Sequence, residues 1–288
     1  MGERTDETFD RAGHLLIVGG GRMGEALAGG LLGRGWPADR LAVVETAPGR
    51  REELLGNHRG LVVEGTVEAA GARLAAGGPG PDWGAAGAVV AVKPHDVTGV
   101  CAGLDSLGVG RVLSIAAGVS LADMEAVMGR AAVLRAMPNT PALVGAGAAA
   151  VSAGTRAGPD DVAWASAILG AIGTVVELPE TSLDAVTGLS GSGPAYVFLV
   201  AEAMVDAGVL AGLTRPVARQ LAVQTLLGSA RLLAETGEEA SALRAAVTSP
   251  GGTTAAGLRA LEAAGVRSAF LDAVMAAAQR AQELGRPH

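Results

Sequence analysis

The sequence predicts two domains, a doubly wound α/β domain with a mainly parallel sheet followed by an all-α domain. Three observations support this prediction: short apolar runs alternate with helical patterns from His14 to Glu177, a glycine-rich turn follows the first run, and only helical patterns occur from Ser182 to Leu284. At 288 residues, the chain is long enough for each domain to bury its own core.

Strands and helices alternate regularly along the first domain. Strands are predicted at 14–18, 41–45, 61–64, 88–92, 111–116, 132–135, 147–152 and 174–177, and helices at 25–34, 49–57, 67–76, from 95 onward, at 121–128 and at 159–170. In the second domain, helices at 195–210 and 217–235 begin beside prolines, and breaks are predicted at 191–194, 212–214, 236–237 and 250–252. We expect a loose tail at 1–12, a dinucleotide-binding domain at 13–178 and a helical domain at 179–288.

The turn Gly19-Gly20-Gly21-Arg22-Met23-Gly24 joins the first predicted strand to the first predicted helix. In that context the spacing of Gly19, Gly21 and Gly24 is the Rossmann fingerprint for a dinucleotide. The first glycine permits a tight turn, the second lets a pyrophosphate approach the backbone, and the third lets helix and strand pack closely. The first domain is therefore predicted to bind a nicotinamide cofactor.

Glu45 ends the second predicted strand, at the distance of about 20 residues where the fingerprint places an acidic side chain. A carboxylate there accepts hydrogen bonds from the adenosine ribose and repels a 2′-phosphate, which favours NADH. Arg50 and Arg51 follow closely, and they either hold that phosphate or lie on a solvated helix face. The choice between NADH and NADPH stays open, with a slight preference for NADH.

Two proline turns follow later strands of the first domain. Lys93-Pro94 comes after the fourth strand, where open α/β sheets bind ligands, and Lys93 is either a cofactor contact or only a cation at a strand end. We expect Asp96 to cap the next helix and to point away from His95. In the segment 135–141, Asn139 and Thr140 either bind the nicotinamide or substrate or form a local turn.

The segment Thr248-Ser249-Pro250-Gly251-Gly252-Thr253-Thr254 precedes a predicted helix at 255–262. Proline fixes the entry of the chain, the glycines uncover backbone N–H groups, and hydroxyls lie in the first turn, so the segment suits a small carboxylate. The alternative is an ordinary helix cap at Ser249 or Thr253 with a tight glycine turn.

Composition argues against several classes of protein. The net charge of −7 and the pI of about 5.2 leave no basic face for nucleic acid or anionic lipid. The single cysteine, Cys101, fits a reducing cytosol, and four scattered histidines give no metal-ligand spacing. The polar head is not typical of a signal peptide, and no run of 18 apolar residues predicts a membrane span, so a cytoplasmic location is expected.

The predicted helix at 196–208 is apolar on nearly every face. A helix of this kind must be buried, and a small helical domain has little interior to hold it. We expect it to pack against a second copy of the chain; the alternative is burial within its own bundle.

Five motifs in order, at 19–24, 92–94, 135–141, 190–196 and 248–254, resemble those of pyrroline-5-carboxylate reductase, and the resemblance extends from about His14 to Leu284. It implies hydride transfer from NADH or NADPH to the C=N carbon of 1-pyrroline-5-carboxylate, which gives L-proline in the last step of proline biosynthesis. It also implies a helical domain interlocked with a two-fold partner, often within a decamer, and a substrate site at that interface beneath the nicotinamide.

The resemblance also implies roles for individual residues. The substrate carboxylate is held around Ser249, Gly251, Gly252 and Thr253, Thr254 stands near the imine nitrogen as the catalytic residue, and the cofactor contacts Gly19, Gly21, Arg22, Met23, Gly24, Glu45, Ala91, Lys93, Pro94, Met137 and Asn139. Arg22 replaces the asparagine or serine often found in the family, and Glu45-Thr46 departs from the serine-plus-arginine pattern of NADPH-preferring members. No metal is implied.

Two other functions fit parts of the sequence. A β-hydroxyacid dehydrogenase shares the domain order, but its chemistry needs a general base, usually lysine, and Lys93 is the only lysine in the chain. A non-catalytic nucleotide-binding regulatory protein is the second alternative, and the intact glycines and Thr254 argue against it.

Overall fold

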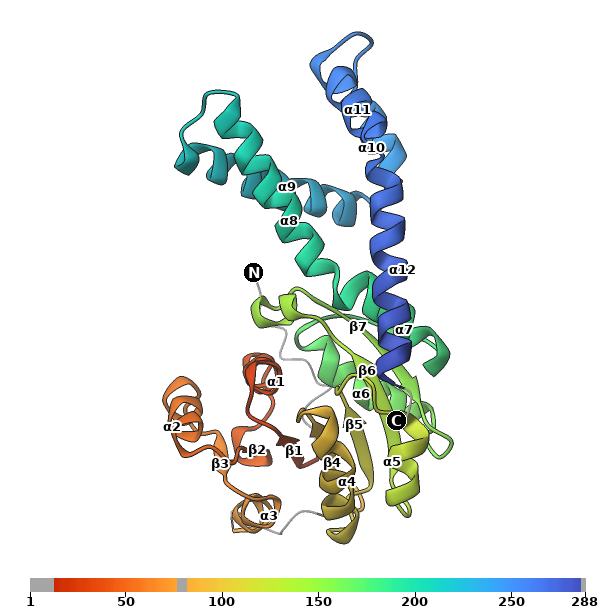
Figure 1. The fold of residues 1–288 in the computed structure, drawn as a ribbon. Helices are drawn as coiled ribbons and strands as arrows, with labels where there is room; N and C mark the ends of the chain where they lie inside the picture. The colour runs from red at the N-terminus through yellow and green to blue at the C-terminus, as the bar shows by residue number, and fades with distance from the viewer. Residues whose placement is uncertain (1–12, 77–81, 286–288) are drawn as a thin grey trace. The chain divides into compact units, whose positions relative to one another are not determined.

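The computed structural model describes residues 13–76 and 82–285. Two compact units make up the chain: one runs up to Gly191 and includes the C-terminal segment from Ala277, and the other is Ser192–Ala276 (Figure 1). The predicted tail at 1–12 and most of the predicted loop at 77–84 lie outside the described residues.

The first unit contains one eight-stranded sheet with the strand order β3-β2-β1-β4-β5-β6-β7-β8. Neighbouring strands are parallel except for β6 and β7, which are antiparallel. The strands are β1 (Leu15–Val18), β2 (Leu41–Val44), β3 (Val62–Glu64), β4 (Gly87–Val90), β5 (Arg111–Ser114), β6 (Ala132–Met137), β7 (Gly147–Ala153) and β8 (Gly173–Glu177). The predicted doubly wound, mainly parallel sheet is confirmed.

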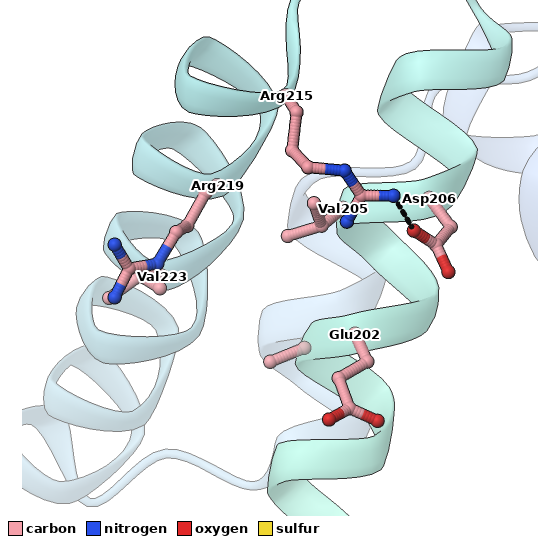
Figure 2. Close-up of a pocket in the computed structure, with 7 residues that line it drawn as sticks. Glu202, Val205, Asp206, Arg215, Arg219 and Val223 are labelled. Atoms are coloured by element: carbon pink, nitrogen blue, oxygen red, sulfur yellow. Dashed lines mark hydrogen bonds and ion pairs between the residues drawn. The ribbon is translucent and has the colours of Figure 1, made fainter.

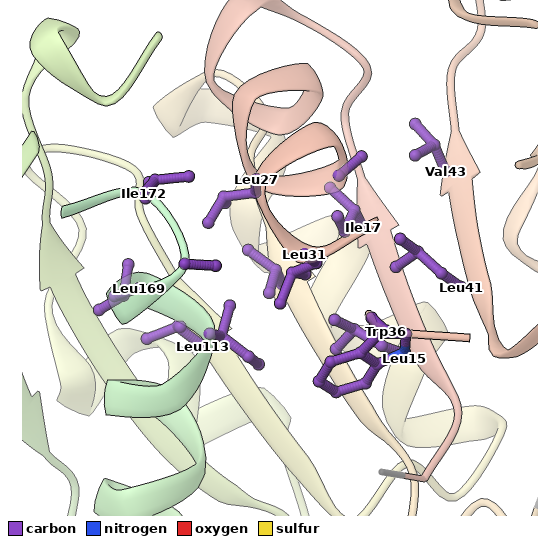
Figure 3. Packing of buried hydrophobic residues seen from close by; sticks show 14 of the residues in the cluster. Leu15, Ile17, Leu27, Leu31, Trp36, Leu41, Val43, Leu113, Leu169 and Ile172 are labelled. Atoms are coloured by element: carbon purple, nitrogen blue, oxygen red, sulfur yellow. The ribbon is translucent and has the colours of Figure 1, made fainter. Parts of the chain in front are cut away.

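Successive residues of a strand point to opposite faces of the sheet. Since the strands carry apolar side chains on both faces, helices cover both. Leu15 and Ile17 of β1 belong to one buried cluster and Leu16 and Val18 to another. The first cluster, shown in Figure 3, includes residues of α1 (Arg22–Gly33), α2 (Pro48–Asn57) and α6 (Pro159–Gly170). The second includes residues of α3 (Val67–Ala75), α4 (Val97–Ser106) and α5 (Leu121–Val127). Because helices fill both faces, ligand access is left at the strand ends.

The second unit consists of helices only, within the described residues. These are α8 (Gly193–Leu210), α9 (Arg215–Thr236), α10 (Ala240–Ala246), α11 (Thr253–Ala263) and the first part of α12 (Val266–Leu284). Helices α8 and α9 pack closely, since a Cβ at Gly208 would lie 3.0 Å from the Cβ of Ala218. Their buried cluster holds only Val205, Ala218 and Ala222.

Most of the apolar surface of α8 is uncovered in a single chain. Phe198 and Leu199 are 63% and 65% exposed. The helical run Glu180–Leu210 is long and apolar enough to cross a membrane by length and composition, although the sequence predicted no such span. It reaches that length because helical structure continues through the glycines at 188–193.

The predicted break at 191–194 is therefore largely wrong. Helix α7 (Leu183–Val186) leads into a π-helical turn, η5 (Thr187–Gly191), and only Ser192 separates that turn from α8. Hydroxyls support the irregular turn, because Thr187 Oγ1 donates to the Leu183 carbonyl at 2.9 Å and Ser190 Oγ donates to the Val186 carbonyl at 3.1 Å. Side-chain donors of this kind make a π-turn tolerable where the glycines alone suggested a loop.

Candidate active site

The order of the sheet reverses at β1, which lies between β2 and β4. Open α/β sheets bind ligands outside the carboxyl ends of the strands at such a reversal. Here Gly19 follows β1 and Ala91 follows β4, and the Ala91 N–H donates to the Val18 carbonyl at 2.8 Å. Two segments predicted to contact the cofactor are thus adjacent.

The glycine turn fits a dinucleotide pyrophosphate. Gly19 has a φ of +110°, and a Cβ there would lie 2.5 Å from the Ala91 carbonyl oxygen. A Cβ at Gly24 would lie 2.0 Å from the Gly19 carbonyl oxygen, so α1 packs directly on the turn. Gly21 is the N-cap of α1, no side chain caps the helix there, and a Cβ at Gly21 would meet no atom within 4 Å. The first-turn N–H groups are therefore open to an anion.

The two side chains inside this turn behave differently. Arg22 is exposed, whereas Met23 is half-buried and packs against the cluster that includes α1. The Arg22 guanidinium is thus free to approach an anion at the helix start, while Met23 anchors the turn to the core.

Glu45 lies directly after β2 with its carboxylate bound to main-chain groups. The Gly20 N–H donates to Glu45 Oε2 at 3.1 Å, and the Ala47 N–H donates to Oε1 at 2.9 Å. The fingerprint does not single out Gly20, because it uses the glycines on either side of it.

Lys93 and Pro94 follow β4, and Pro94 opens a 3₁₀ turn, η2 (Pro94–Asp96), before α4. Lys93 is exposed beside this turn. Asp96 is the N-cap residue of α4, yet its side chain makes no capping bond. Its Oδ2 lies instead 3.3 Å from His95 Nε2. The predicted cap and the predicted separation of these two side chains are both wrong, because the Asp96 carboxylate pairs with the imidazole of its neighbour instead of capping α4.

Asn139 joins two motifs that are far apart in the sequence. Its Nδ2 donates to the Ser190 carbonyl at 3.0 Å across 51 positions, and its Oδ1 accepts from the Ala148 N–H at 2.8 Å. Met137 lies beside the same turn, since a Cβ at Gly191 would lie 2.8 Å from the Met137 Cε. The segment 135–141 and the π-turn therefore form one structure, which sequence spacing alone did not indicate.

In the second unit, the segment 248–254 forms an uncapped helix start. Gly251 has a φ of +72°, and the Gly252 N–H donates to the Ser249 carbonyl at 3.0 Å. Gly252 is the N-cap of α11, and no side chain caps that helix, so the alternative of an ordinary cap at Ser249 or Thr253 is wrong. Ser249, Thr253 and Thr254 are exposed. The first-turn N–H groups and the hydroxyls of these three residues are available to a carboxylate, whereas the Thr248 hydroxyl donates to the Arg244 carbonyl at 2.6 Å.

Two cavities lie outside the glycine turn and the helix start at 248–254. One of about 470 Å³ in the first unit is lined by Gly118, Ser120, Arg135, Thr181, Asp184, Gln282 and Gly285. The other, of about 460 Å³, lies between α8 and α9, and the ion pair between Arg215 Nη2 and Asp206 Oδ1 at 2.7 Å crosses one end of it (Figure 2). Within the described residues, no group of three or more His, Cys, Asp or Glu side chains is placed to hold a metal ion.

Cys101 is buried in α4 among the residues of the second cluster. Burial raises the pKa of the Cys101 thiol to about 11. We expect a thiol-specific reagent at neutral pH to label the folded protein at least about 100-fold more slowly than the denatured protein, because the thiolate is scarce and inaccessible. Since the chain has one cysteine, a colorimetric thiol assay measures this residue directly. Rapid stoichiometric labelling of the folded protein would contradict the prediction.

Comparisons with known proteins agree with this geometry. Residues 180–284 match a family model described as pyrroline-5-carboxylate reductase dimerisation, and residues 14–118 match one described as NADP oxidoreductase, coenzyme F420-dependent. The pyrroline-5-carboxylate reductase of Synechocystis sp. is 45% identical over 94% of this chain and 98% of its own length.

Two solved structures extend the similarity to three dimensions. A pyrroline-5-carboxylate reductase from Coxiella burnetii superposes with a TM-score of 0.87 and 33% identity, over 96% of this chain and 100% of that one. The Plasmodium falciparum pyrroline carboxylate reductase with NADP bound gives a TM-score of 0.79 and 28% identity, over 96% and 99%. By sequence over nearly its whole length and by fold, the chain belongs to the pyrroline-5-carboxylate reductase family.

Proposed function

We propose that this protein reduces the C=N bond of 1-pyrroline-5-carboxylate to give L-proline, with NADH or NADPH as the reductant. The observation that carries the proposal is the match to pyrroline-5-carboxylate reductases along 94% of the chain. The open glycine turn at the sheet reversal supports it independently, because that turn suits a dinucleotide.

The proposed cofactor site lies at the carboxyl ends of β1, β2 and β4. The main chain at Gly19, Gly21 and Gly24 would receive the pyrophosphate, with Arg22 and Met23 between them. Glu45 would receive the adenosine ribose. The nicotinamide half would lie near Ala91, Lys93, Pro94, Met137 and Asn139, where Asn139 can offer only its second amide hydrogen, because Ser190 accepts the first. When bound, the cofactor supplies the hydride.

The proposed substrate site is the helix start at 249–254. Uncovered N–H groups at the beginning of α11 would bind the carboxylate, helped by Ser249 and Thr253. Thr254 would place its hydroxyl at the imine nitrogen. Because a pyrrolinium ion already carries its proton, these residues need only bind and orient it, and no strong acid is required.

We assign residues 13–178 to the cofactor domain and 179–288 to the helical domain, and we propose a homodimer that assembles further into a decamer in the cytoplasm. The apolar faces of α8 are then covered by protein rather than by lipid. The acidic net charge supports the absence of nucleic acid among the partners.

A spectrophotometric assay tests the proposed function. Purified protein with 1-pyrroline-5-carboxylate is expected to oxidise NADH, NADPH or both, and proline is expected to accumulate in equal amount. If neither cofactor is oxidised while both bind, the proposed reaction is wrong. An alcohol substrate of a β-hydroxyacid dehydrogenase serves as the comparison, and reduction of the oxidised cofactor with it would favour that alternative.

Replacing Thr254 by alanine tests the proposed substrate site. We expect kcat/KM for the imine to fall by about tenfold, or roughly 1.4 kcal/mol, because one hydrogen bond to the reacting nitrogen is lost. The dissociation constant of the cofactor should not change. Thr254→Ser, which keeps the hydroxyl, should retain most of the activity. Unchanged kinetics in Thr254→Ala would remove this residue from the mechanism.

A further inference from the structure

The carboxylate of Glu45 is held in place on both sides. Its two oxygens accept from the N–H groups of Gly20 and Ala47, and its own N–H donates to the Glu64 carbonyl at 2.9 Å. The backbone approaches it closely, because a Cβ at Gly20 would lie 2.9 Å from the Glu45 Cβ. A negative charge is therefore fixed where β2 meets the glycine turn, and side-chain rotation cannot easily remove it.

Arg50, a cation of α2, already has partners for all three guanidinium nitrogens. Nε donates to the Gly20 carbonyl at 2.8 Å, Nη1 donates to Glu53 at 2.8 Å, and Nη2 pairs with Glu25. The hydrogen bonds that Arg50 donates to Glu53 and then to Glu25 raise the pKa of Arg50. Asn57 also binds Glu25 at 2.9 Å, and this bond is the main reason why the pKa of Glu25 is lowered. Two carboxylates thus balance the charge of Arg50 before any ligand arrives.

Arg51 is directed to the main chain. Its Nη1 donates to the carbonyl oxygens of Glu45 and Thr46 at 2.9 and 2.8 Å. A Cβ at Gly65 would lie 3.3 Å from the same nitrogen, so the guanidinium lies between the chain segments that follow β2 and β3. Arg51 therefore stabilises the chain segments that follow these two strands.

These contacts also define the charge that a ligand would meet. Around the end of β2, three carboxylates (Glu25, Glu45 and Glu53) face two arginines, one of them paired with two of those carboxylates. An NADPH 2′-phosphate would bring nearly two further negative charges beside Glu45. The ribose 2′-hydroxyl of NADH can instead donate a hydrogen bond to that carboxylate.

We propose that Glu45, anchored by the N–H groups of Gly20 and Ala47, selects NADH over NADPH. The ion pairs of Arg50 with Glu25 and Glu53 reinforce this selection, because they keep Arg50 from binding the 2′-phosphate of NADPH. The inference rests on the proposed function for the identity of the cofactor class. It concerns this chain alone, since the Plasmodium falciparum relative has NADP bound.

Cofactor dissociation constants measured by calorimetry, without the imine, test the selection. The unmodified protein is expected to bind NADH at least about tenfold more tightly than NADPH, because like charges brought together in a binding site are disfavoured. Glu45→Gln keeps the size of the side chain and removes its charge, and it should reduce this preference by about tenfold. Glu52→Gln is the matched control, because Glu52 is an exposed carboxylate on α2, the helix that follows Glu45, and the preference should not change.

A third variant tests whether Arg51 contributes to NADPH binding. Arg51→Gln should leave NADPH affinity within about twofold of the unmodified protein if Arg51 binds only the main chain and not the cofactor. Equal or tighter binding of NADPH by the unmodified protein overturns the inference, and so does a large loss of NADPH affinity in Arg51→Gln or an unchanged preference in Glu45→Gln. Because these measurements do not require turnover, a failure of imine reduction would count against the proposed function and leave the selectivity result standing.

Discussion

Gly21→Ala is expected to weaken the binding of both NADH and NADPH by about 100-fold, or about 2.7 kcal/mol, while leaving the fold intact. The backbone of Gly21 is extended, with φ −65° and ψ −175°, so alanine fits its conformation. In the free protein the added methyl group would meet no atom within 4 Å. The space that it fills is the space through which the pyrophosphate is proposed to approach the first turn of α1.

The matched control for this experiment lies in the same helix. Gly33 ends α1, is exposed, and likewise has no atom within 4 Å of an added Cβ. Gly33→Ala should bind both cofactors normally. Cofactor binding is measured by calorimetry, and thermal unfolding of Gly21→Ala should shift by no more than about 4 °C, the effect of a weaker N-cap residue. Normal affinity in Gly21→Ala would place the pyrophosphate elsewhere.

Both the glycine fingerprint and the fold class were predictable because they depend on local patterns. Apolar residues on every position of β1 indicate a strand buried on both faces, and the two clusters that share Leu15–Val18 confirm it. Helix α6 has the predicted limits, since Pro159 fixes its start. A strand–glycine–helix order predicts the position of the cofactor site without knowledge of any tertiary contact.

Contacts between distant residues could not be predicted in this way. The hydrogen bond from Asn139 to Ser190 forms because the segment that follows β6 lies beside the π-turn. The ion pair between Glu25 and Arg50 forms because α1 and α2 bring these two side chains together. Strand β6 extends to Met137, beyond its predicted end at Arg135, because Met137 pairs with Ala150 of the antiparallel β7. Each of these features is set by a partner elsewhere in the chain, which periodicity does not report.

Leu199→Asp is expected to dissociate the dimer and to abolish activity at low protein concentration. Val197, Phe198 and Leu199 are consecutive residues of α8 and all are exposed in the single chain. Because successive helical residues differ by about 100° in direction, these three cover more of the helix circumference than one neighbouring helix can bury. The family model for dimerisation spans this helix, so we expect a partner chain to cover it.

Burying a leucine contributes about 1.5–3 kcal/mol, and burying a carboxylate without a partner is unfavourable by several kcal/mol more. The dimer dissociation constant should therefore rise by at least about 100-fold, as measured by sedimentation. Leu55→Asp is the matched control: Leu55 is 49% exposed on α2, outside residues 180–284, and its substitution should leave the oligomer unchanged. If dissociation causes the loss of activity, specific activity should recover as protein concentration rises. An intact oligomer in Leu199→Asp would show that α8 is not at the interface between chains.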